Sequence, residues 1–238
     1  MTRTLIQGAQ VLIENDHFAD VSLLIENDQI AAILPQGETV ADAKPLDATR
    51  RIVIPGLVNG HTHSHGALAR GGVPDDAILE TFLSGSAWLN LGRSLDDLAL
   101  CAQLSAVELI RKGCTACFDL FIELPGPTVE GTHAVAHAYH DVGLRAVVAP
   151  MIADQTIYQA LPGLLEAFDG PLKDAVAAMT LPDWDSTMQH VRRAKHVRSD
   201  APCRHAQPGA HHRQRPVDPH DRGVRHGDTW QRAVVGVR

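Results

Sequence analysis

From residue 57 onward, short apolar stretches alternate with stretches of helical periodicity, and no other feature of the sequence restricts the fold as much. The apolar stretches predict three buried strands, which begin at residue 57, at residue 114 and at residue 145. The helical stretches predict helices at residues 94–112, 129–142 and 182–195. Strands that alternate with helices are typical of a parallel sheet or barrel with the helices outside. The sequence therefore predicts an α/β fold over residues 56–195.

The first predicted helix has recognisable ends. Ser94, followed three residues later by Asp97, resembles a capping box. Lys112 and Gly113 provide a C-terminal stop. Apolar and small side chains recur between these ends at helical spacing: Leu98, Cys101, Ala102, Ser105 and Leu109.

Three stretches rich in Leu, Ile and Val open the chain, at residues 4–13, 21–26 and 29–34. Asn–Asp pairs separate them, as expected for antiparallel strands joined by turns. Residues 26–29 fit a hairpin connection, although the strongest hairpin signals contain glycine. We therefore predict that residues 1–55 form a separate portion built from β-strands.

The composition excludes several classes of function. The 238 residues carry a formal net charge of −7 and have a pI near 6.0, so the chain lacks the basic surface that nucleic-acid binding requires. No apolar run is long enough to cross a membrane, and the first residues do not resemble a signal peptide. Four cysteines in a chain of this length do not form a disulfide framework. We expect a cytoplasmic protein without nucleic-acid or membrane partners, and homo-oligomerisation stays open.

Residues 196–238 differ in composition from the rest of the chain. They carry eight Arg against four Asp, and six of the fourteen His, but no Leu, Ile, Phe or Lys. A basic tail for nucleic acid and ordinary disorder are two interpretations. The composition favours a third, a shift of reading frame near residue 196 in a GC-rich gene, because Arg, Pro, Ala, Gly and His have GC-rich codons. We treat residues 196–238 as an atypical tail, disordered or out of frame.

His61 and His63 are the strongest candidates for chemistry. Side chains alternate along a strand, so two residues at this spacing point to the same face and can meet one metal ion. A His-x-His pair alone occurs often by chance. Here it follows a Pro55–Gly56 turn and ends a predicted strand, which is where a barrel carries its catalytic groups.

The residues around this pair resemble a known family. Residues 51–63 are similar to the signature of the amidohydrolase superfamily, in the branch of cytosine and guanine deaminases, adenosine-type deaminases acting on thioethers, and triazine chlorohydrolases. Residues 21–33 resemble the small β-sandwich of that family, and residues 108–116 resemble its first barrel helix and second strand. The resemblance covers residues 3–168.

The resemblance implies a fold and an activity. The expected fold is a β-sandwich portion at residues 1–55 and a partial (β/α)₈ TIM barrel of a metal-dependent hydrolase at residues 56–195. The expected cofactor is one zinc or iron ion per intact site, with His61 and His63 as the first two ligands. Its bound hydroxide would hydrolyse a carbon–nitrogen bond outside peptides and so deaminate a small cyclic substrate.

The sequence departs from the family pattern after the second ligand. The resemblance implies a further His from the fifth strand, an Asp from the eighth, and a Glu as proton shuttle. No Glu follows Glu166, however, and no His lies between Met151 and Gln189. The alternative is therefore a truncated, catalytically inactive remnant with a binding or oligomerisation role at most.

Other residues are weaker candidates. Three residues could line a substrate pocket near the predicted strand that ends at His61 and His63: His65, Trp88 and Asp119. Two spaced pairs have ordinary explanations: Cys114 and Cys117 favour core packing, and His133 and His137 favour a solvated helix face.

Overall fold

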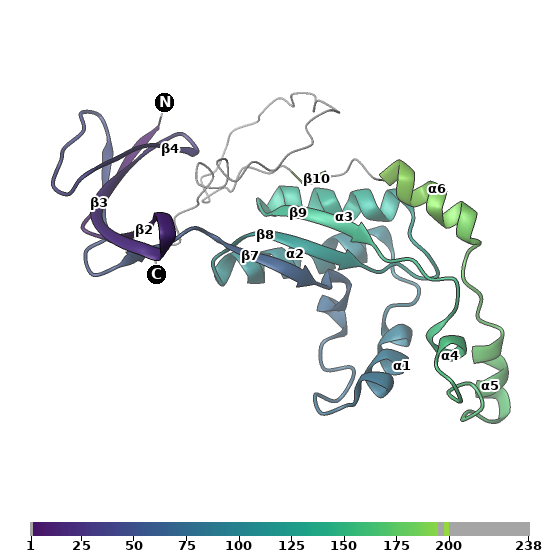
Figure 1. The fold of residues 1–238 in the computed structure, drawn as a ribbon. Coiled ribbons are helices and arrows are strands. Elements are labelled where there is room, and N and C mark those ends of the chain that lie inside the picture. Colours follow the sequence, from purple (N-terminus) through teal and green to yellow (C-terminus); the bar gives the residue numbers. More distant parts are fainter. Residues whose placement is uncertain (1, 195–197, 200–238) are drawn as a thin grey trace. The chain divides into compact units, whose positions relative to one another are not determined.

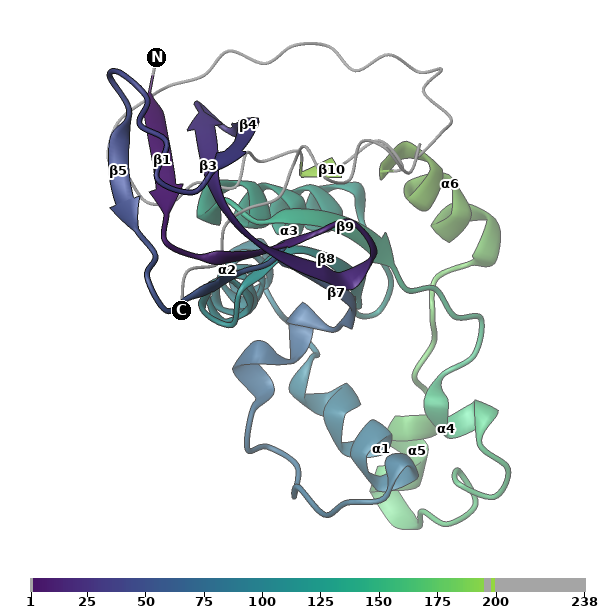
Figure 2. The ribbon, with the colours of Figure 1, turned by 60° about the vertical axis from the view of Figure 1, so that its left-hand side comes forward.

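The computed structural model describes residues 2–194 and 198–199 (Figures 1 and 2). It is a mixed α/β structure with two compact units, the first ending at Leu57 and the second beginning at Val58. Among the described helices, none has the length and apolar character needed to span a membrane. The predicted tail at residues 196–238 lies outside the described residues, except for residues 198–199.

The first unit contains a six-stranded sheet. Its path runs β5–β1–β3–β2–β6, and β4 pairs with β3. The long strand β3 pairs antiparallel with β1, β2 and β4, whereas β5 and β6 run parallel to their neighbours. The strands are β1 (Arg3–Gln7), β2 (Gln10–Ile13), β3 (His17–Glu26), β4 (Gln29–Pro35), β5 (Lys44–Asp47) and β6 (Ile52–Val53).

Gly8 divides the predicted first strand, residues 4–13, into β1 and β2. Its φ of +82° lies in the left-handed region that favours glycine, and a Cβ here would lie 2.6 Å from Thr49 Oγ1. The β3–β4 hairpin forms at the predicted turn, with Asn27 at a φ of +57°. Side chains from β1, β2, β3 and β6 build a small core that includes Ile6, Val11, Leu23 and Val53.

The second unit contains a four-stranded sheet in the order β10–β9–β8–β7. Strands β8 and β9 are parallel, and the arrows of β7, β8 and β9 point the same way in Figure 1. The short β10 pairs antiparallel with β9. The strands are β7 (Leu57–Thr62), β8 (Cys114–Phe121), β9 (Arg145–Pro150) and β10 (Arg198–Ser199).

Two helices, α2 and α3, cover one face of this sheet. Alternate residues of β8 and β9, among them Cys117, Phe121 and Val148, pack against both helices in one core. The helices of the unit are α1 (Leu79–Leu89), α2 (Leu95–Arg111), α3 (Val129–Val142), α4 (Ile157–Ala160), α5 (Gly170–Ala177) and α6 (Trp184–Ala194), and a 3-10 helix spans Ser64–Ala69.

The ends of α2 agree with the sequence. Ser94 and Asp97 form a reciprocal capping box, in which Ser94 Oγ accepts from the Asp97 amide and Asp97 accepts from the Ser94 amide. At α3, Thr128 caps the N-terminus and Gly143 ends the helix with a φ of +91°. Strand β7, however, is not the buried strand that the sequence predicts. Leu57 is 50% exposed and Val58 is 70% exposed.

Candidate metal centre

The two histidines of the His-x-His pair lie at the end of β7, and their side chains converge. His61 is the second-last residue of β7, and His63 is the first residue after the strand. Their Nε2 atoms are 3.1 Å apart. Two nitrogens bound to one tetrahedral zinc at about 2.0–2.1 Å would lie about 3.3 Å apart. The pair therefore has the spacing of two ligands on one ion.

The ring of His63 is held by the next strand. Its Nδ1 lies 2.9 Å from the carbonyl oxygen of Leu120, which can only accept, so Nδ1 carries the proton. In a neutral ring this leaves the lone pair on Nε2, the atom that faces His61. A metal-ligating histidine is usually held in this way through its other nitrogen.

His65 is half-buried and contacts the backbone that follows β8. Its Nδ1 accepts a hydrogen bond from the amide of Ile122 at 3.2 Å, which places the ring proton on Nε2. Burial, the largest cause, and the charges of His63 and Arg93 together lower the pKa of His65 to about 3. The Arg93 guanidinium also donates to the carbonyl of His65 at 2.7 Å, so ring and backbone are both fixed.

A buried carboxylate lies beneath this segment. Asp119 Oδ1 accepts from the amide of Ser64 at 3.0 Å, and Oδ2 accepts from the Ser64 hydroxyl at 2.5 Å and the Tyr139 hydroxyl at 3.1 Å. Burial raises the pKa of the Asp119 carboxyl above its usual range, although these hydrogen bonds oppose the shift. Burial also raises the pKa of Tyr139, and the charge of Asp119 adds to that effect.

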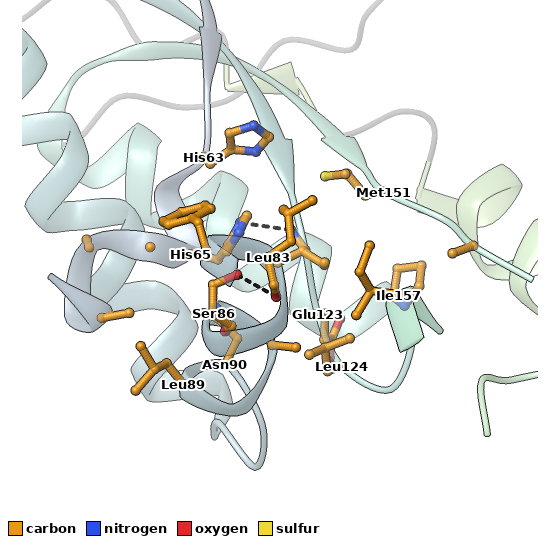
Figure 3. Close-up of a pocket in the computed structure, with 18 of the residues that line it drawn as sticks. His63, His65, Leu83, Ser86, Leu89, Asn90, Glu123, Leu124, Met151 and Ile157 are labelled. Atoms are coloured by element: carbon orange, nitrogen blue, oxygen red, sulfur yellow. Dashed lines mark hydrogen bonds between the residues drawn. The ribbon is translucent and has the colours of Figure 1, made fainter. Parts of the chain in front are cut away.

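A cavity of about 1080 Å³ adjoins the histidines. In Figure 3, His63 lies at one end of it, and Leu89, Asn90 and Leu124 lie at the other. Most of its wall is apolar and comes from α1, from the loop after β8 and from the segment after β9. An apolar cavity with a few polar groups is the usual form of a small-molecule site.

Of the three predicted pocket residues, the structure brings only His65 to this cavity. Asp119 is fully buried and its oxygens are taken up by Ser64 and Tyr139, so it is not among the lining residues. Trp88 is not among the lining residues either; its ring centroid lies 6.3 Å from that of Tyr158, which does line the cavity. Neither Asp119 nor Trp88 is among the residues that line this cavity, and their contact with a substrate stays a prediction.

Sequence reasoning missed Glu123, which does line the cavity. Its two oxygens accept from the amide and the hydroxyl of Thr128, at 2.7 and 2.8 Å, and so sit over the N-terminus of α3. The signal was a carboxylate five residues before a helix cap, but nothing local indicated that it faces a cavity.

The other spaced pairs lie apart from the histidine pair. Cys117 belongs to the core between the sheet and the helices, as predicted, and Cys114 is half-buried. His133 and His137 lie on α3 with ring centroids 6.1 Å apart, and His137 is exposed. Within the described residues, no group of three or more His, Cys, Asp or Glu side chains could hold a metal ion.

Helices that flank parallel strands, with polar side chains and a cavity beyond the strand ends, form the arrangement in which α/β enzymes carry their sites. Residues 52–211 match the sequence model of the amidohydrolase family, and the chain belongs to this family. The matched range runs past residue 196, where the composition changes.

Curated relatives are similar to part of the chain. A 5-methylthioadenosine/S-adenosylhomocysteine deaminase of Haloarcula marismortui is 34% identical over 151 residues, which cover 62% of this chain and 33% of the relative. A 5'-deoxyadenosine deaminase of Methanobrevibacter smithii is 34% identical over 148 residues, covering 61% of this chain and 32% of the relative. The chain spans about a third of the length of these relatives.

Solved structures share the fold. An atrazine chlorohydrolase from Arthrobacter aurescens, complexed with zinc, matches with a TM-score of 0.57 and 21% identity over 71% of this chain and 44% of that one. An adenosine deaminase from Xanthomonas campestris, with bound zinc, matches with a TM-score of 0.52 and 25% identity over 61% of this chain and 33% of that one.

Proposed function

We propose that this chain carries the first two metal ligands of a metal-dependent hydrolase that deaminates a small cyclic substrate. The observation that carries the proposal is the convergence of His61 and His63 at 3.1 Å, with the Nδ1 of His63 held by the Leu120 carbonyl. The names of the relatives support hydrolysis of a ring carbon–nitrogen bond, and the zinc in two structural relatives supports the metal.

The residues present fit such an ion in part. His61 and His63 would hold it through their Nε2 atoms, and zinc suits imidazole ligands, with iron as the alternative. When bound, the ion would lower the pKa of a water molecule to near neutrality and supply hydroxide. The Leu120 carbonyl keeps the proton on Nδ1 of His63 and leaves its Nε2 free to bind.

The cavity would take the substrate. Its apolar walls suit the face of an aromatic ring, and the relatives suggest an aminopurine with an attached sugar or thioether. His65 lines this cavity, and its Nε2–H is a donor that could orient a ring nitrogen. Glu123 also lines this cavity, but both of its carboxylate oxygens accept hydrogen bonds from Thr128.

The finer fold follows the same proposal. We infer that the six-stranded sheet is the β-sandwich portion, with residues 1–55, and that β7, β8 and β9 are strands of a partial (β/α)₈ barrel within residues 56–195. The family match and the structural likeness support this assignment.

One observation favours the alternative of an inactive remnant with a binding role. Within the described residues the histidine pair has no third metal ligand, whereas a catalytic zinc usually has three protein ligands. Zinc content separates the two functions. Zinc measured by mass spectrometry in the purified chain, and lost in both His61→Ala and His63→Ala, supports the hydrolase. A folded chain that binds no zinc, or binds it equally well in both variants, supports the remnant.

A further inference from the structure

The C-terminal end of β8 holds the residues that follow β7. His63 donates from Nδ1 to the carbonyl of Leu120, and His65 accepts at Nδ1 from the amide of Ile122. On the β8 side both partners are backbone groups, so these two contacts do not depend on the type of side chain at residues 120 and 122. The residue between the two histidines is held in a different way.

Ser64 is held by a side chain of β8. Its amide and its hydroxyl both donate to the carboxylate of Asp119, at 3.0 and 2.5 Å. The third donor, Tyr139, comes from α3 at 3.1 Å. The side chains of Asp119, Ser64 and Tyr139 are all fully buried or nearly so. Among these hydrogen bonds between residues 63–65 and the end of β8, those of Ser64 use a β8 side chain, whereas those of His63 and His65 use backbone groups.

An aspartate is suited to position 119, whereas an apolar residue would leave the three donors around it without an acceptor. A carboxylate accepts at both oxygens, whereas the amide of an asparagine accepts at only one and must present its NH₂ group to the other donors. A buried carboxylate is costly unless its hydrogen bonds are complete, and here three donors meet it. Because this costly carboxylate is hydrogen-bonded to Ser64, the residue that follows His63, it suggests a role in holding the histidine.

We propose that Asp119 is a positioning residue, which acts through Ser64 to hold His63 in the ring orientation and tautomer that suit metal binding. The bond between His63 Nδ1 and Leu120 requires the correct backbone position at residue 63, because hydrogen bonds weaken steeply as their angle closes. The amide of Ser64 belongs to the peptide unit that follows His63, so Asp119 fixes that position directly. The metal itself rests on the proposed function above.

The experiment uses the full chain and two measurements. Nitrogen-15 NMR of the imidazole rings shows which nitrogen of His63 carries the proton, without metal. Titration with Zn²⁺ against a chromophoric chelator gives the dissociation constant. The test variants are Ser64→Ala and Asp119→Asn. Thr132→Val is the matched control, because it removes a buried hydroxyl that donates to the Thr128 carbonyl at 2.8 Å, away from the histidines.

In the wild-type chain we expect the proton of His63 on Nδ1. In Asp119→Asn we expect a mixture of tautomers and Zn²⁺ binding that is weaker by about 10- to 100-fold, the usual effect of losing a group that supports a metal ligand. In Ser64→Ala, which loses only the hydroxyl bond to Asp119, we expect a smaller change in the same direction. Thr132→Val should keep the wild-type tautomer and affinity. Ser64→Ala retains the amide bond to Asp119 and is the milder change, so its smaller shift in tautomer and affinity provides the readout if Asp119→Asn does not fold.

The wild-type tautomer and affinity in both test variants would overturn the proposal. A fourth variant, His61→Ala, separates the two hypotheses. If it leaves Zn²⁺ binding unchanged, the proposed function fails, and the tautomer of His63 still decides the role of Asp119. If it weakens binding while the test variants do not, the metal site stands and the positioning role is refuted.

Discussion

Replacing Phe121 by alanine should strongly destabilise the second unit. Phe121 is the last residue of β8 and is fully buried in the core that the sheet shares with α2 and α3. Truncating a buried Phe typically costs about 3–5 kcal/mol, from lost transfer free energy and from the cavity left behind. The whole stability of a domain is about 5–15 kcal/mol, so this one change removes a large fraction of it.

The same strand offers a matched control. Phe118 lies three residues earlier, points to the opposite face of the sheet and is 38% exposed. Its truncation leaves no closed cavity, so only part of the transfer free energy is lost, about 1–2 kcal/mol. The two Phe→Ala variants should therefore differ by roughly 2–3 kcal/mol.

Urea denaturation followed by circular dichroism at 222 nm measures this difference. All the described α-helices lie after residue 57, so the helical signal reports on the second unit. In a thermal melt, Phe121→Ala should lower the midpoint by roughly 10 °C. Equal losses in the two variants would refute the reasoning, because they would mean that the two faces of β8 are equally covered.

Three further predictions concern the site and its surroundings. At pH 8, iodoacetamide should label Cys114 well before Cys117, because burial raises the pKa of Cys117 to about 12 and only a thiolate reacts. Peptide mass spectrometry measures the labelling, and equal labelling of the two cysteines would contradict this prediction. Glu123→Gln should lower stability by about 1–2 kcal/mol in urea, since it weakens two bonds at the N-terminus of α3, whereas an unchanged midpoint would show that the contact contributes little. With added zinc, the isolated chain should turn over aminopurines, aminopyrimidines and chlorotriazines at a negligible rate, because hydroxide formation needs about three firm ligands; robust turnover that His61→Ala abolishes would show a complete site.

Local signals in the sequence predicted the central elements of the second unit. The capping box at Ser94 and Asp97 marks the start of α2, and Gly143 marks the end of α3. Helix α1 was missed because no side chain caps its start at Ile78 and none of its residues is buried. The exposure of Leu57 and Val58 was also missed, because an apolar run looks the same whether or not other elements cover the faces of its strand.

In the site, too, features set by neighbouring residues could be predicted from the sequence, and features set by residues far apart in the chain could not. The spacing of His61 and His63 predicted that their rings point the same way, and the rings do meet, although β7 ends at Thr62 and His63 lies just after it. The groups that hold these rings could not be predicted, since Leu120 is 57 residues from His63 and Asp119 is 55 residues from Ser64. Asp119 shows the consequence. Its place at the end of a strand suggested substrate contact, but the hydroxyl of Tyr139 and the backbone of Ser64 enclose it. A polar residue at a strand end therefore serves the site either by facing the cavity or by holding a neighbour that does. The sequence does not distinguish these two roles, and the three-dimensional structure does.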